Sequence, residues 1–342
     1  MKREEVLRLD GIKKYYQVRG GGLGKPRKFV KAVDGIDLTI YRGECVGVVG
    51  ESGSGKSTLG RLALRLIEAT EGQVFFQGIN ITTMSPPVLR RHRANMQMIF
   101  QDPYSSLNPR LTIGQTLREA VKFHRIVPSE EVSQYVDELL SRVGLSPEFA
   151  GRYPRALSGG QRQRVAIARA LAVEPTLVVA DEAVSALDVS IQAEILNLLQ
   201  DIRRGQELTV LFISHDLSVV ELMSDRVLVM YLGRPMELAP AESIYHHARH
   251  PYTQALLSAA PSFEGEQVKI EGEIPSATSP PSGCVFRTRC PFALPKCSEV
   301  VPTLRQVTQG QFVACIRTDI AGETIAEANP DIDRKEYDVE SR

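Results

Sequence analysis

The stretch Gly50-Glu-Ser-Gly-Ser-Gly-Lys-Ser57 decides the fold of this chain. The apolar run Cys45-Val-Gly-Val-Val49 precedes it, and a helical pattern begins near Lys56. The spacing fits G-x-x-x-x-G-K-[ST], in which glycines let the backbone wrap around a polyphosphate. A chance glycine-rich turn is the alternative, but strand, loop and helix follow in the required order. The stretch therefore predicts a phosphate site at a helix N-terminus.

The side chains of this loop are expected to have different roles in binding ATP. Lys56 is expected to reach the β- and γ-phosphates, and the hydroxyl of Ser57 to bind Mg²⁺. The candidate ATP-binding residues are Gly50, Glu51, Ser52, Gly53, Ser54, Gly55, Lys56, Ser57 and Thr58.

A second apolar run ends in two carboxylates, Val178-Val-Ala-Asp181-Glu182. In a parallel sheet the carboxyl end of such a strand faces the nucleotide. Asp181 is then expected to hold Mg²⁺ through water, and Glu182 to act as general base on the attacking water. The alternative is a strand that simply ends in a solvated turn. The presence of the phosphate-loop motif in the same chain disfavours this alternative.

Strands and helices alternate along the second half of the chain. Helical patterns over 161–172, 190–204 and 217–224 are separated by apolar runs over 176–180, 208–213 and 226–232. Such alternation predicts an α/β fold with a mostly parallel sheet. Strands are also expected within residues 7–18, 29–49 and 73–81, and helices within residues 110–150.

Composition limits the function classes. The chain of 342 residues has a formal net charge of zero, so no overall charge favours nucleic acid. No segment approaches the about 18 consecutive apolar residues of a membrane helix. The charged start, Met1-Lys2-Arg3, has no apolar signal core behind it. A cytosolic protein without nucleic-acid partners is expected.

The stretch Leu157-Ser-Gly-Gly-Gln161 begins another helix. A second helix N-terminus that favours anions suggests a head-to-tail dimer with ATP between the subunits. LSGGQ is also the signature of ABC ATPases, and residues 5–260 resemble that family. The resemblance implies a P-loop ABC cassette with antiparallel β and helical subdomains. It implies that Leu157, Ser158, Gly159, Gly160 and Gln161 face the ATP of a partner subunit.

The same resemblance assigns further site residues. Gln101 in Phe-Gln-Asp-Pro is similar to the glutamine that contacts Mg²⁺ and water. His215 resembles the switch histidine, and Tyr16 the aromatic that stacks on adenine, although Tyr15 is adjacent. The D-loop corresponds to Ser185, Ala186, Leu187 and Asp188. Ala183 stands where many relatives have proline, a departure that affects turn stiffness rather than chemistry.

Several segments resemble the oligopeptide, dipeptide and nickel importers, and most closely their second ATPase subunit. They are Phe100-Gln-Asp-Pro-Tyr-Ser-Ser-Leu-Asn-Pro109, Asp188-Val-Ser-Ile-Gln-Ala193, His250-Pro-Tyr-Thr-Gln-Ala-Leu-Leu257 and Gly283-Cys-Val-Phe-Arg-Thr-Arg-Cys-Pro-Phe-Ala293. The resemblance implies a peripheral ATPase on the cytoplasmic face of the inner (plasma) membrane. Its implied partners are a second ATPase subunit, two permeases and an external binding protein, with peptide, nickel or oligosaccharide as cargo. A soluble ABC protein of DNA repair or translation remains the alternative, but the chain has neither a long coiled coil nor tandem cassettes.

Four cysteines lie within 32 residues near the C-terminus: Cys284, Cys290, Cys297 and Cys315. In a cytosolic chain such a cluster indicates metal ligation before disulfides. The spacing lacks the close pair of a zinc knuckle, and Cys290-Pro291 resembles ferredoxin ligation. A [4Fe–4S] cluster, which some resembling ATPases carry, is therefore expected ahead of zinc or free thiols, and Cys45 is expected in the core.

Composition divides the chain into three parts. Residues 1–260 are expected to form the nucleotide-binding domain, with a helical subdomain at about 102–165. Prolines crowd the following segment, so residues 261–318 are expected to be a small irregular Cys-rich domain. Residues 319–342 hold eight acidic and three basic side chains and predict a flexible tail.

Overall fold

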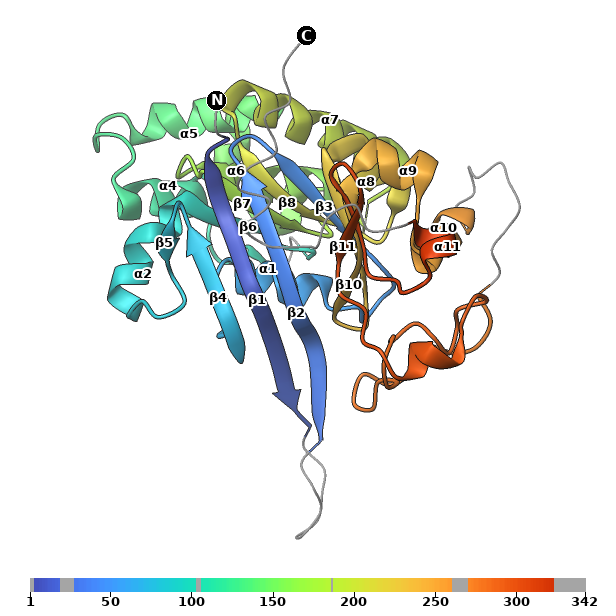
Figure 1. Cartoon of the computed structure of the whole chain (residues 1–342). Helices are drawn as coiled ribbons and strands as arrows, with labels where there is room; N and C mark the ends of the chain where they lie inside the picture. The colour runs from blue at the N-terminus through green and yellow to red at the C-terminus, as the bar shows by residue number, and fades with distance from the viewer. Residues whose placement is uncertain (1–2, 19–27, 103–105, 186, 260–269, 323–342) are drawn as a thin grey trace. The chain divides into compact units, whose positions relative to one another are not determined.

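The computed structural model describes residues 3–18, 28–102, 106–185, 187–259 and 270–322 (Figure 1). Ala186 of the expected D-loop and the expected tail from residue 323 onward lie outside the described residues. Within these ranges, no helix has both the length and the apolar character needed to cross a membrane.

The chain divides into two compact units, each described here by itself. The first unit contains Met1–Tyr41, Cys45–Thr82 and His215–Arg342, and the second contains Arg42–Glu44 and Thr83–Ser214.

An antiparallel sheet in the order β2-β1-β4-β5 forms part of the first unit (Figure 1). Its strands are β1 (Glu5–Gln17), β2 (Phe29–Tyr41), β4 (Glu71–Phe76) and β5 (Ile79–Asn80). The pairing of β1 with β2 shifts register between Leu9 and Ile12. Gly11, with φ +52°, permits this bulge. The extra residue keeps Leu9 and Ile12 on one face, where they are 1% and 0% exposed.

Five other strands of the first unit lie in the order β11-β12-β10-β9-β3. They are β3 (Cys45–Val49), β9 (Arg226–Tyr231), β10 (Arg234–Pro240), β11 (Arg305–Thr308) and β12 (Gln311–Val313). β3 and β9 are parallel, and β9–β10, β10–β12 and β12–β11 are antiparallel. Every residue of β3 and β9 is buried. This burial explains the apolar sequence of β3 and the apolar run that follows Arg226 in β9.

The helices of the first unit are short. They are α1 (Lys56–Ala63), α8 (Leu217–Met223), α9 (Ala241–His247), α10 (Pro251–Ser258), α11 (Thr318–Ala321) and the 3₁₀ turn η4 (Pro295–Ser298). No pattern in the sequence predicted α9, α10 or the hairpin of β11 and β12. The hairpin differs most from the loop-rich segment that was expected, because β12 adds to the edge of β10. Strands of three and four residues are too short for a period-2 pattern to be read.

The second unit contains three parallel strands in the order β6-β7-β8. They are β6 (Met96–Ile99), β7 (Leu177–Asp181) and β8 (Thr209–Ile213). The helices are α2 (Pro86–His92), α4 (Ile113–His124), α5 (Val132–Arg142), α6 (Gly159–Leu171), α7 (Val189–Gln206) and the 3₁₀ turns η1 (Arg93–Asn95), η2 (Pro147–Gly151) and η3 (Pro154–Ala156). The parallel strands confirm the α/β prediction.

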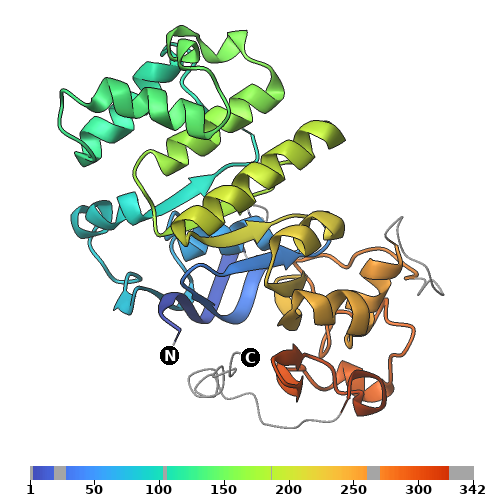
Figure 2. The same cartoon turned by 90° about the horizontal axis from the view of Figure 1, so that it is seen from above.

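Helices α4, α5 and α6 pack on one another and form the green group in Figure 2. Their buried positions recur at helical spacing, as at Val136, Leu139 and Leu140 of α5. Thr112 begins α4 with a capping box, because its hydroxyl accepts from Gln115 N–H while Gln115 Oε1 accepts from Thr112 N–H. The three helices thus bury their apolar faces against one another.

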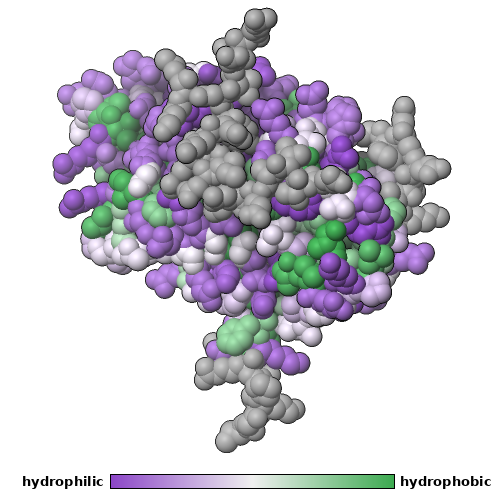
Figure 3. All heavy atoms as spheres, in the orientation of Figure 1, coloured by the Kyte–Doolittle hydropathy of each residue, from purple (hydrophilic) through white to green (hydrophobic). Residues whose placement is uncertain are grey.

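The face of the molecule drawn in Figure 3 is mainly hydrophilic, with small separate apolar patches. The exposed apolar side chains of the protein include Phe123 at 63% and Val189 at 83%. Single exposed apolar side chains are ordinary for a protein surface.

Candidate active site

The phosphate loop joins β3 to α1 inside the first unit. Its glycines have left-handed backbone angles, with φ +149° at Gly50 and +102° at Gly55. A Cβ atom on Gly50 would lie 2.1 Å from the carbonyl oxygen of Met230, and one on Gly55 would lie 2.0 Å from that of Ala32. Main-chain atoms on neighbouring strands cannot yield as a flexible side chain can. These two positions therefore require glycine, and the loop is held tightly against the sheet.

Lys56 lies inside this loop and is 5% exposed. Its Nζ donates to the carbonyl oxygens of Gly50 at 2.6 Å and Glu51 at 3.0 Å. Gly55 begins α1, and no side-chain oxygen caps the first turn. The partial positive charge of this helix end and the ammonium group of Lys56 thus act on the same loop. The hydroxyl of Ser54 is buried there without a hydrogen-bond partner among the described residues.

The two tyrosines near the end of β1 have different environments. The hydroxyl of Tyr15 donates to Asp34 Oδ1. Burial alone would raise the pKa of Asp34, but the hydrogen bond from Tyr15 and the charge of Arg234 outweigh burial and lower it. Tyr16 is 40% exposed. Because Tyr15 is engaged by Asp34, Tyr16 is the better candidate for stacking on a base.

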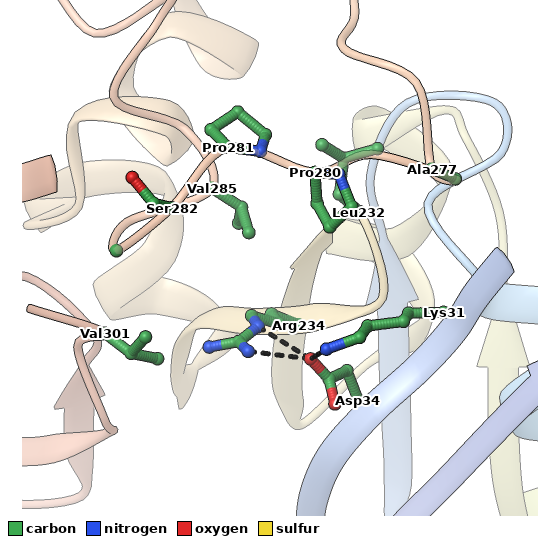
Figure 4. A pocket seen from close by; sticks show the side chains of 11 residues that line it. Lys31, Asp34, Leu232, Arg234, Ala277, Pro280, Pro281, Ser282, Val285 and Val301 are labelled. Carbon is green, nitrogen blue, oxygen red and sulfur yellow. Dashed lines mark hydrogen bonds and ion pairs between the residues drawn. The ribbon is translucent and has the colours of Figure 1, made fainter. Parts of the chain in front are cut away.

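A cavity of about 240 Å³ lies beside Asp34 in the first unit (Figure 4). Strand β2, the turn after β9 and strand β10 provide Lys31, Asp34, Leu232 and Arg234. Residues after α10 provide Ala277, Pro280, Pro281, Ser282, Gly283, Val285 and Val301. Arg234 Nη2 lies 2.7 Å from Asp34 Oδ2, and Lys31 Nζ lies 3.8 Å from the same oxygen. The carboxylate of Asp34 thus interacts with both positively charged side chains that line the cavity, Lys31 and Arg234. No residue predicted to bind ATP lines this cavity.

Gln101 and Glu182 meet in the second unit. Each follows the end of a strand, β6 for Gln101 and β7 for Glu182, and these strands are parallel neighbours. Gln101 Nε2 donates to Glu182 Oε2 at 2.7 Å. Glu182 has φ +48°, a conformation uncommon in residues other than glycine and concentrated at active sites. Asp181, the last residue of β7, is 2% exposed.

The LSGGQ stretch lies at the start of α6 in the second unit. Ser158 N–H donates to Gln161 Oε1 at 3.0 Å, and Gln161 N–H donates to Ser158 Oγ at 3.3 Å. This capping box holds the helix end in shape. A Cβ atom on Gly160 would lie 2.6 Å from Cγ2 of Ile191 in α7. The sequence predicted the helix start correctly, while the contact with α7 required the tertiary structure.

The expected D-loop follows Glu182 in the second unit. Ser185 Oγ donates to the carbonyl oxygen of Glu182 at 3.0 Å, and Asp188 begins α7. Ala183 is 2% exposed, so its side chain belongs to the core.

His215 belongs to the first unit and is exposed. It precedes Asp216, whose carboxylate accepts from Ser218 N–H at 2.9 Å and so begins α8. The first unit thus holds Tyr16, His215 and residues 50–58, and the second holds the remaining predicted ATP-site residues.

The four C-terminal cysteines are free thiols that lie near one another in the first unit. Burial, followed by the charges of Cys315, Cys290 and Cys297, raises the pKa of Cys284 to about 11. Two backbone N–H groups donate to cysteine sulfurs: that of Arg317 to Sγ of Cys315 at 3.5 Å, and that of Leu294 to Sγ of Cys297 at 3.4 Å. Among the described residues, however, no three His, Cys, Asp or Glu side chains are arranged to hold a metal ion. Cys45 is 0% exposed, in the core as expected.

Sequence reasoning gave no function to two residues that contact the phosphate loop. The hydroxyl of Tyr252 and the guanidinium of Arg289 both bond to Glu51. Each belongs to a segment quoted for its resemblance to peptide importers, and this resemblance was the available signal.

Fold and loop geometry together define a P-loop nucleotide-binding protein. Residues 33–185 match the family described as ABC transporter, and residues 236–297 match the oligopeptide/dipeptide transporter C-terminal region. The oligopeptide transport ATP-binding protein AppF of Bacillus subtilis is 50% identical over 320 residues, which cover 92% of this chain and 97% of AppF. The chain belongs to the ABC transporter ATP-binding proteins, in the oligopeptide/dipeptide branch.

Two solved structures are similar to part of the chain. The ATP-binding cassette MJ0796, a dimer bound to ADP and phosphate, matches with a TM-score of 0.62 and 30% identity over 69% of this chain and 98% of that one. The protein cbiO1 of Clostridium perfringens, part of the transporter complex cbiONQ, matches with a TM-score of 0.61 and 27% identity over 71% of this chain and 92% of that one. These comparisons confirm the ABC cassette fold.

Proposed function

We propose that this chain is the ATP-hydrolysing subunit of an ABC transporter that imports peptides. The observation that carries the proposal is 50% identity to an oligopeptide transport ATP-binding protein along almost the whole of both chains. The match of residues 236–297 to the oligopeptide/dipeptide C-terminal region supports the same cargo class. Nickel and oligosaccharide are the alternative cargoes.

In the proposed mechanism, the phosphate loop binds the triphosphate and Glu182 deprotonates the water that attacks the γ-phosphorus. The water oxygen bonds to phosphorus while the bond to the β,γ-bridging oxygen breaks, which leaves ADP and phosphate. Ser57, Gln101 and Asp181 would hold Mg²⁺, which neutralises charge on the phosphates. His215 would contact the γ-phosphate. The hydrogen bond between Gln101 and Glu182 supports their action on one water.

The working unit in this proposal is a dimer. Residues 157–161 of one subunit complete the site formed by residues 50–58 of the other, and residues 185–188 lie at the seam. The dimer of the MJ0796 cassette supports this arrangement. We further propose a second, different ATPase subunit, two permeases and an external binding protein as partners. The assembly would lie at the cytoplasmic face of the membrane.

The proposal is tested by purifying the tagged chain from its own cells in mild detergent and reconstituting the complex in vesicles. We expect two membrane-spanning permeases and a second ATPase subunit to co-purify. Di- and oligopeptides, added with the binding protein, should then stimulate ATP hydrolysis. Stimulation by Ni²⁺ or by oligosaccharides instead of peptides would replace the cargo assignment. Co-purification with nucleic acid and no permease would contradict the transport function.

The region after residue 260 is proposed to carry a [4Fe–4S] cluster held by Cys284, Cys290, Cys297 and Cys315. Four neighbouring thiols and backbone N–H groups directed at the sulfurs fit this donor chemistry, because such hydrogen bonds favour the thiolate. The thiols would have to move closer together, since the described part of the chain contains no group of three His, Cys, Asp or Glu side chains placed to hold a metal ion. A cluster would stabilise a small Cys-rich domain that has little core of its own. Zinc is the alternative.

Anaerobic purification tests the cluster. We expect the wild-type chain to be coloured, with iron and acid-labile sulfide in equal amounts, and Cys290→Ser to lose both. Cys45→Ser is the matched control, because Cys45 is a core residue of β3 and is not one of the four proposed ligands, and it should keep the colour. Colourless wild-type protein with one zinc ion per chain would establish zinc instead, and metal-free protein would exclude both.

A further inference from the structure

Two segments that follow α9 in the chain contact the phosphate loop at one residue, Glu51. The backbone N–H of Glu51 donates to the hydroxyl of Tyr252 with an N···O distance of 3.0 Å. Its carboxylate accepts from Arg289, whose Nη1 lies 2.7 Å from Oε2. Tyr252 belongs to α10, and Arg289 directly precedes Cys290. Helix α10 and the Cys284–Cys290 segment thus both contact Glu51, the second residue of the loop.

The ion pair between Arg289 and Glu51 is largely shielded from water. The side chains of Arg289 and Glu51 are 10% and 22% exposed. Nη1 of Arg289 also donates to the hydroxyl of Tyr231 at 3.3 Å. Water and salt therefore screen this pair less than an ordinary surface pair, and removing one partner leaves a partly buried charge behind.

Aromatic packing fixes the segment that carries Arg289. Phe286 is 0% exposed, and its ring centroid lies 5.2 Å from that of Tyr252 and 5.4 Å from that of Tyr231. Cys284 N–H donates to the carbonyl oxygen of Cys297 at 2.8 Å. The five residues between Cys284 and Cys290 include both Phe286 and Arg289. A change in the arrangement of these cysteines must therefore act on Arg289.

We propose that Arg289 and Tyr252 are positioning residues for the phosphate loop, and that through Glu51 the Cys284–Cys290 segment sets the affinity of the chain for ATP. The inference rests on the proposed ATP site at residues 50–58. Neither side chain touches a phosphate in this proposal. Tyr252 fixes the loop backbone, and Arg289 neutralises a carboxylate in a loop that must accept a highly charged anion.

Thermodynamic linkage makes the coupling reciprocal. If the Cys284–Cys290 segment changes the affinity for ATP, ATP must change the equilibrium of that segment by the same factor. Nucleotide binding is therefore expected to alter the amide hydrogen exchange of residues 284–290, whether or not the cysteines hold a cluster. This readout requires neither turnover nor a mutation.

The test compares the full-length variants Arg289→Ala, Tyr252→Phe and Arg287→Ala. Arg287 is the matched control, because it lies in the same segment and donates to the carbonyl oxygen of Ser282 at 2.8 Å rather than to the loop. Calorimetry measures the dissociation constant of each variant for AMP-PNP, a non-hydrolysable ATP analogue, in the presence of Mg²⁺. For Arg289→Ala we expect it to rise about 5–150-fold, the usual range of site–site coupling. Arg287→Ala should match the wild type, and kcat at saturating ATP should stay close to that of the wild type for all three.

A double-mutant cycle separates positioning from a general loss of stability. In a Glu51→Gln background, Arg289→Ala should cause no further loss of affinity, and Arg289→Lys should restore part of it in the wild-type background. An effect of Arg289→Ala that persists with Glu51→Gln would overturn the proposal. Equal amide hydrogen exchange of residues 284–290 in the wild type with and without AMP-PNP would also overturn it. Wild-type protein that fails to bind AMP-PNP would instead refute the ATP site itself.

Discussion

Glu182→Gln should lower the turnover number for ATP by about 10²–10⁴-fold, the usual contribution of a general base. The substitution keeps the size of the side chain and removes only its basicity. Gln101 Nε2, which donates to Oε2 of Glu182 at 2.7 Å, can donate equally to the amide oxygen of the variant. The local geometry and the binding of ATP should therefore survive. Because hydrolysis would normally separate the subunits, the variant should accumulate as an ATP-bound dimer.

Phosphate release, ATP binding and sedimentation measure these three properties. Glu138→Gln is the matched control, since Glu138 is an exposed residue of α5 in the same unit. It should hydrolyse ATP at the wild-type rate. Wild-type hydrolysis by Glu182→Gln would show that another group activates the water.

Lys56→Met should weaken ATP binding by about 10–150-fold, because a hydrogen bond to a charged group contributes roughly 1.5–3 kcal/mol. The ammonium group of Lys56 lies 2.6 Å from the carbonyl oxygen of Gly50, inside the loop that is to receive the phosphates. Methionine keeps the length of the side chain but supplies no charge. Lys56→Arg should also bind poorly, because the planar guanidinium must replace a compact ammonium group at a buried position that is 5% exposed.

Calorimetric titration with AMP-PNP gives these affinities, and thermal unfolding checks that each variant folds. Lys122→Met, at an exposed position near the end of α4, is the control and should bind like the wild type. If folded Lys56→Met bound AMP-PNP with unchanged affinity, Lys56 would have no part in phosphate binding.

Local sequence patterns predicted the strand, loop and helix start around residues 50–57, because neighbouring residues create this geometry. Glycine spacing, an apolar strand and a helix start are properties of consecutive residues, and the structure has them at β3 and α1. The alternation of strands and helices after residue 158 likewise matched β7, β8 and β9 within a few residues at each end. The short hairpin of β11 and β12 was missed, because its pairing with β10 depends on residues about 75 positions earlier.

Pairs of residues distant in sequence were the least predictable part of the site. Nothing near Tyr15 or Tyr16 in the sequence shows which one is engaged. The hydrogen bond to Asp34, which distinguishes them, joins two strands. In the same way, the motifs around His250 and Cys290 resembled importers, yet gave no sign that Tyr252 and Arg289 reach Glu51.

The sequence alone determined the class of this protein, because its phosphate loop, its carboxylate-ended strand and its LSGGQ stretch are each encoded by neighbouring residues. Only the tertiary structure decided what surrounds the loop. Backbone oxygens of Met230 and Ala32 make two of its glycines obligatory. Tyr252 and Arg289, about 200 and 238 positions beyond Glu51, hold it from outside. Such contacts depend on how separate elements pack, and packing brings together residues that no local pattern connects.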